Sequence, residues 1–190
     1  MKKNVLRSLL GATLVAASLS TTATPVNPTA ASAGSSTGSF DINLILEPHI
    51  IVTGFEDMTI NAANTNATET DNICIGGFGF TNFNVSFGSL NGNADVNTPN
   101  GTDPFLLLDS STSETIPYSV GFANSASASA ANETSSDGSL SSNFARAATA
   151  ASCLGGTENA TLFVGVSASD WQDVQGKSFT DTLTVMVEAI

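Results

Sequence analysis

Hydrophobic and polar residues alternate along short stretches of this chain with the two-residue period of a β-strand. The clearest case is residues 38–46, GSFDINLIL, where four apolar side chains fall on one face: Phe40, Ile42, Leu44 and Leu46. Asp41 and Asn43 fall on the other face, and only Ile45 breaks the period. A strand with one apolar face must bury it against something, so this segment predicts a strand that needs a partner.

Similar short patterns follow, separated by residues typical of turns. We predict strands at 49–52 and 58–60, 73–75, 78–87, 105–108, 115–122, 160–166 and 179–187, and polar loops at 61–72 and 91–103. In the last strand the side chains of Phe179, Leu183, Val185 and Val187 share one face with Asp181. No segment keeps a 3.6-residue apolar period for three turns, so the pattern predicts an all-β sandwich.

Residues 125–151 are rich in Ser and Ala and poor in large apolar side chains. This low-complexity segment is compatible with a long loop or with an excursion at a sheet edge, and 144–151 has weak helical character.

The start of the chain has the pattern of a secretory signal peptide. Lys2, Lys3 and Arg7 precede a short apolar stretch at 9–19, which falls short of the roughly 20 residues that cross a membrane. Cleavage after Ala23 and after Ala33 both fit, and the second has the better motif. We therefore expect a signal peptide within 1–33, an N-terminal extension at 34–47 and a sandwich domain at 48–190.

The charge balance narrows the choice of partners. The whole chain has a net charge of −12, but three of its five basic residues lie in the predicted signal peptide. Arg146 and Lys177 then remain against 17 acidic residues, a formal charge of −15. A surface this acidic repels nucleic acid and anionic lipid, so we do not expect those partners. The simplest interpretation of the charge is that it keeps the protein soluble and tolerant of salt at a cell surface.

Cys74 and Cys153 are the only cysteines. An even pair in an exported chain predicts an intramolecular disulfide. A metal or redox pair would call for CxxC spacing or a nearby histidine, and neither is present. The bridge closes a loop of about 80 residues, which the chain-entropy model values at up to roughly 4 kcal/mol.

The sequence offers no catalytic pattern. His49 is the only histidine, and no GxSxG, HExxH or P-loop motif occurs. Asp170 and Asp173 flank Trp171 as in a polar turn, and the Asn-rich stretch 91–97 lacks the glycine and closing glutamate of an EF-hand. We therefore expect no enzyme activity, no cofactor and no metal.

Five segments in order carry a resemblance: STGSFDINLILEP, CIGGFGFTNFNVSFGS, IPYSVGF, ATLFVGVSASDW after the second cysteine, and GKSFTDTLTVMVEAI. Together they resemble pilins of the chaperone–usher class, in particular its archaic branch with the spore-coat-U-like subunits, and they share features with the alternate-type pilins. The resemblance covers about residues 36–190. No single motif is specific to the family, and the similarity depends on the order in which the five segments occur.

The resemblance implies an incomplete immunoglobulin-like sandwich that lacks its last strand. A periplasmic chaperone lends a strand, and the N-terminal extension of the next subunit replaces it at an outer-membrane usher. Phe40, Ile42, Leu44 and Leu46 would then be the donor side chains, and Phe179, Leu183, Val185 and Val187 would line the acceptor groove. Cys74 and Cys153 would form the stabilising bridge.

The expected function is that of a major structural subunit in a linear homopolymer of identical subunits, exported through the periplasm to the cell surface as a fimbria that supports adhesion or biofilm formation. The long 125–151 segment departs from the family pattern, and we expect a surface elaboration there. The alternative is a self-contained secreted β-sandwich that binds carbohydrate. Such a protein should expose a cluster of aromatic rings, but Tyr118 and Trp171 are the only aromatics besides Phe, and Tyr118 lies on an inward-facing pattern.

Overall fold

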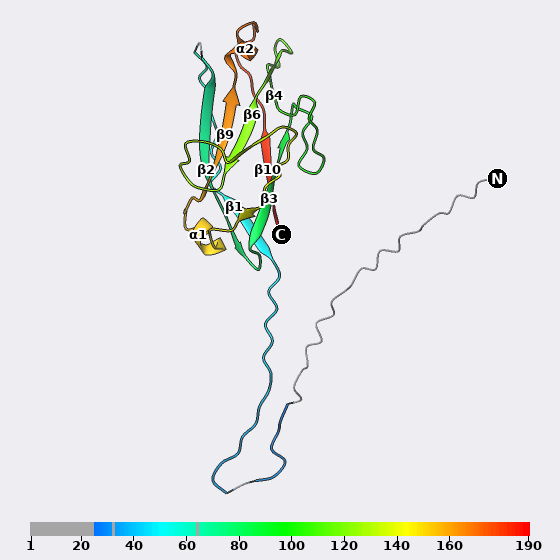
Figure 1. Ribbon diagram of the computed structural model, residues 1–190, viewed down its shortest axis with the longest axis vertical. Helices are drawn as coiled ribbons and strands as arrows, with labels where there is room; N and C mark the ends of the chain where they lie inside the picture. The colour runs from blue at the N-terminus through cyan, green and yellow to red at the C-terminus, as the bar shows by residue number, and fades with distance from the viewer. Residues whose placement is uncertain (1–24, 32, 64) are drawn as a thin grey trace, which may run out of the picture. The chain divides into compact units, whose positions relative to one another are not determined.

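The computed structural model describes residues 25–31, 33–63 and 65–190 (Figure 1). The predicted signal peptide lies outside the described residues if it ends at Ala23. The longer form, which ends at Ala33, also includes the described residues 25–31 and 33. The chain divides into two units, Met1–Ile45 and Leu46–Ile190, which we describe separately. In the described residues no helix is long and apolar enough to cross a bilayer.

In the first unit, Val26 and Ser39 form an isolated antiparallel bridge through two backbone hydrogen bonds of 3.0 and 3.1 Å. Residues 40–48, which continue into the second unit, belong to no helix or strand. The strand predicted at 38–46 is thus not formed in the single chain. A β-strand is defined by backbone hydrogen bonds to a neighbouring strand, so an apolar alternation alone cannot produce one.

The second unit is all-β, which confirms the predicted fold class at this level (Figure 1). Its larger sheet has the order β1 (His49–Thr53), β2 (Ala67–Phe78), β9 (Ala160–Val166), β6 (Ser119–Ala123) and β7 (Glu133–Ser135). A smaller sheet contains β10 (Leu183–Ala189), β3 (Asn82–Ser89) and β8 (Phe144–Ala145), and a hairpin joins β4 (Leu106–Leu108) to β5 (Thr115–Pro117). The pairings between these strands are antiparallel.

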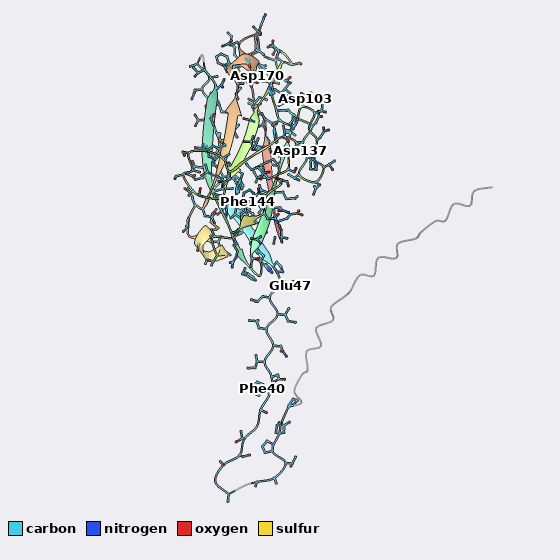
Figure 2. The ribbon with its side chains drawn as sticks, viewed as in Figure 1. Phe40, Glu47, Asp103, Asp137, Phe144 and Asp170 are labelled. Carbon is cyan, nitrogen blue, oxygen red and sulfur yellow. A yellow bond between two sulfur atoms is a disulfide. The ribbon has the colours of Figure 1, made fainter. Side chains whose placement is uncertain are left out.

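One hydrophobic core joins the two sheets. Phe83 of β3 and Phe122 of β6 are fully buried and meet edge to face, with ring centroids 6.4 Å apart. Phe144 of β8 packs against both rings, and Figure 2 shows this side chain within the body of the domain. Ile73 and Leu162 add aliphatic side chains from β2 and β9. The domain is therefore a two-sheet sandwich around aromatic residues that alternate along their strands.

The strand at 160–166 coincides with β9, but the loop predicted at 61–72 is wrong from Ala67 onward. There β2 begins with exposed side chains at Thr68, Glu69 and Thr70. These residues are held in the sheet by backbone pairing with β9, in which Glu69 lies opposite Val164. Because both faces of this strand end carry polar side chains, the pattern of hydrophobic residues could not reveal it.

The segment at 125–151 contains β7, β8 and the first two residues of helix α1 (Ala150–Leu154) between irregular stretches. The side chain of Thr149 caps α1 by accepting a hydrogen bond from the backbone N–H of Ser152. A second short helix, α2 (Ala168–Trp171), follows β9.

The Cys74–Cys153 disulfide is confirmed. It joins the middle of β2 to α1 with a Cα–Cα distance of 5.3 Å across 79 positions of sequence, and both residues are buried. Ala148 and Ile51 pack around it as a small second cluster. The bridge therefore fixes the end of the long irregular segment to the central part of the larger sheet.

Candidate strand-accepting groove

Two sheet edges lie at the site. β1 forms one edge of the larger sheet, and β10 forms one edge of the smaller sheet. β10 pairs with β3 from Leu183 opposite Ser89 to Ala189 opposite Phe83. In the described part of the chain no strand pairs with the other side of β10, so its backbone groups there can accept a further strand.

A groove of about 410 Å³ lies beside this free edge. Leu183 and Val185 of β10 line it, together with Met58 and Ile60, which follow β1 outside any strand. Leu162, a core residue, also lines the groove. The groove therefore reaches the hydrophobic core.

The four residues predicted to line an acceptor site are placed as follows. Leu183 and Val185 line the groove, whereas Val187 lies further along β10 and Phe179 precedes that strand. All four are partly buried and pack against the core. The segment at 55–60 was missed as a groove component, although the alternation of Met58 and Ile60 with polar neighbours had marked it as strand-like.

Four carboxylate side chains also line the groove: Glu56, Asp57, Asp71 and Asp181. Asp71 is only 8% exposed, and its Oδ2 accepts a hydrogen bond of 3.1 Å from the backbone N–H of Glu56. Burial raises the pKa of Asp71, and the negative charge of Glu56 raises it further. The groove lining thus includes a carboxyl group, that of Asp71, whose charged form is already disfavoured in the single chain.

Asp181 fixes the start of β10. Its carboxylate accepts hydrogen bonds from the Tyr118 hydroxyl at 2.6 Å, from the Ser89 hydroxyl at 2.5 Å and from the backbone N–H of Asn91 at 3.0 Å. Burial and the hydrogen bond to Asp181 raise the pKa of Tyr118. This network explains how an acidic residue just before β10 can line the groove beside apolar side chains.

The segment predicted as a donor strand exposes its apolar face. The exposed fractions are 75% for Phe40, 82% for Ile42, 80% for Leu44 and 57% for Leu46. Ile45, on the opposite face of the alternation, is 87% exposed. The same chain thus carries an apolar groove beside a free strand edge and an apolar segment that is not buried.

No family model matches the chain, and no curated protein or solved structure gives a significant match.

Proposed function

We propose that the chain is a structural subunit of a surface fibre in which each copy inserts residues 40–46 into the groove of the next copy. The observation that supports this most strongly is the groove at the free edge of β10, together with an exposed alternating segment in the same chain. Addition of an extended segment to a free sheet edge gains backbone hydrogen bonds, and its alternate side chains fill the groove.

The lengths suggest a register. β10 contains seven residues, and 40–46 spans the same number. In antiparallel orientation, as between the named strands of this domain, Leu46 would lie opposite Leu183 and Leu44 opposite Val185. Ile42 and Phe40 would continue toward the end of β10. This register places the four apolar donor side chains on one face, toward the core.

The energy of such a contact is large. Burial of an apolar side chain of this size contributes about 1.5–3 kcal/mol, so four of them contribute roughly 6–12 kcal/mol before the cost of ordering the segment. The contact would dissociate slowly, as a fibre requires. A periplasmic chaperone that covers the groove before assembly and an outer-membrane usher are part of the proposal, as is a role of the fibre at the cell surface in adhesion or biofilm formation.

The test is deletion of residues 34–47. The shortened chain should fold and should bind a synthetic peptide of residues 38–47 in trans, but it should form no polymers in the presence or absence of that peptide. Polymers of normal length from the shortened chain would contradict the proposal.

The carbohydrate-binding alternative gains no support from Tyr118, the only tyrosine. Tyr118 is 8% exposed and its hydroxyl is bound to Asp181, so its ring offers no exposed face for a sugar.

A further inference from the structure

The chain immediately after the donor segment is held tightly against the end of β2. The carbonyl oxygen of Glu47 lies 3.0 Å from Nδ1 of His49 and can accept a hydrogen bond from it, and the His49 ring stacks on Phe78 with centroids 4.8 Å apart. Gly77 and Gly79 permit this close approach. A Cβ on Gly77 would overlap the carbonyl oxygen of His49, and one on Gly79 would lie 3.0 Å from Cα of Pro48.

These contacts create a surface that we call the root patch, consisting of Pro48, His49, Phe78 and Arg146. Phe78 is 41% exposed although it is a large aromatic residue. The Arg146 guanidinium donates a 2.6 Å hydrogen bond to the carbonyl oxygen of Gly77 and lies 5.5 Å from the centre of the Phe80 ring. The patch therefore combines exposed apolar area with the only arginine of the described residues.

The link between donor segment and domain is very short. Only Glu47 and Pro48 separate Leu46 from His49, the first residue of β1. At about 3.3–3.6 Å per residue, the three steps from Leu46 to His49 span at most roughly 11 Å. A copy whose Leu46 lies opposite Leu183 of its neighbour must therefore bring its root patch close to the start of the neighbour's β10.

That end of the groove is acidic. Asp181 lies two residues before β10, and Glu56, Asp57 and Asp71 line the same groove, whereas no basic side chain of the described residues lines it. The root patch carries the positive charge of Arg146 and no carboxylate among its own residues, with Glu47 adjoining it in the link. Opposite charges at the rim of an interface speed association and fix the orientation of the partners.

We infer that the root patch is a second interface between consecutive copies and that it seats on the acidic end of the neighbour's groove. This inference rests on the proposed strand exchange. The partner is another copy of this chain, and the contact would limit bending between the two domains in addition to the connection through the donor strand.

The first experiment lengthens the link. Four residues, Gly-Ser-Gly-Ser, are inserted between Glu47 and Pro48 of the full exported chain, and the matched control has the same insert between Ser35 and Ser36. Polymers with the first insert should have a persistence length at least about twofold shorter in electron micrographs, because the patch no longer reaches its site. The control should match the wild type, and equal stiffness of both insert variants would overturn the inference.

The second experiment tests the charge. Arg146→Gln should slow polymer growth about three- to tenfold at low salt, with little effect at high salt, whereas Lys177→Gln serves as the control and should leave growth unchanged. The slowing should vanish in the chain with the longer link. If it persists there, Arg146 acts within its own domain and the inference is wrong.

The outcomes also distinguish a failure of this inference from a failure of the strand-exchange proposal on which it rests. If the wild-type chain forms no polymers, strand exchange itself fails. If every variant polymerises with the stiffness and growth rate of the wild type, strand exchange stands and only the second interface fails.

Discussion

Replacement of Leu44 by serine should weaken the link between copies. Leu44 is 80% exposed in the free chain, and in the proposed register its side chain enters the groove beside Val185. Burial of a whole leucine side chain contributes about 1.5–3 kcal/mol, so the exposed part accounts for about 1–2.5 kcal/mol. That loss corresponds to a roughly 5- to 60-fold rise in the dissociation constant.

The assay measures binding of labelled peptides of residues 38–47 to the full chain in which Phe40, Ile42, Leu44 and Leu46 are all serine, so that the acceptor cannot polymerise. Fluorescence anisotropy gives the dissociation constants of the wild-type and Leu44→Ser peptides. The Ile45→Ser peptide is the matched control, because Ile45 is 87% exposed and lies on the opposite face of the alternation.

The expected result is a large loss of affinity for Leu44→Ser and little change for Ile45→Ser. Equal losses for the two peptides would show that general hydrophobicity, and not a register with alternate side chains inward, governs binding. Unchanged affinity for Leu44→Ser would show that this side chain does not enter the groove.

Three further predictions concern the domain itself. Joint replacement of Cys74 and Cys153 by serine should lower the free energy of unfolding by about 4 kcal/mol, seen as a lower urea midpoint, because the closed loop spans 79 positions; an unchanged midpoint would contradict this. Gly77→Ala should destabilise the domain and lower its melting temperature, because the added Cβ would overlap the backbone of His49. Gly156→Ala is the control: its Cβ would meet no atom, so it should cost only the backbone strain of an alanine at a φ of +80°. Burial acts to raise the pKa of Glu133, but hydrogen bonds from Ser141 and Ser142 outweigh it and lower the pKa to about 2 from an ordinary 4.5. Its contribution to stability is therefore present above pH 4.5 and is lost as the pH falls toward 2, so the melting temperatures of wild type and Glu133→Gln should converge over that interval; a constant difference would exclude this role.

Much of the fold follows from alternation wherever a strand has one buried face. β9 was predicted with its full bounds because Leu162, Val164 and Val166 alternate without interruption. The disulfide followed from the pairing rule for exported chains, without any knowledge of which elements it joins. These features depend on local pattern or on simple chemistry, and both can be read from the sequence.

The groove could be predicted only in part. Alternation placed Leu183 and Val185 on one face of the last strand, and the resemblance to chaperone–usher pilins implied that they line a groove. The rest of the lining includes residues 55–60, which form no strand and reach the site only through tertiary packing. The polar start of β2 was missed because its stability comes from pairing with β9 and not from burial of its own side chains. Long-range backbone pairing leaves no periodic signal in a polar segment.

The most direct test of strand exchange is a cross-link between copies. In the proposed register Ile45 of one copy lies opposite Thr184 of the next, both pointing away from the core, and the two native cysteines are already paired. Chains that carry Ile45→Cys and chains that carry Thr184→Cys are mixed and oxidised, and the products are separated without reduction. The account predicts a disulfide-linked dimer that contains one chain of each kind. Absence of this dimer in a mixture that still forms polymers would contradict the insertion of residues 40–46 beside β10.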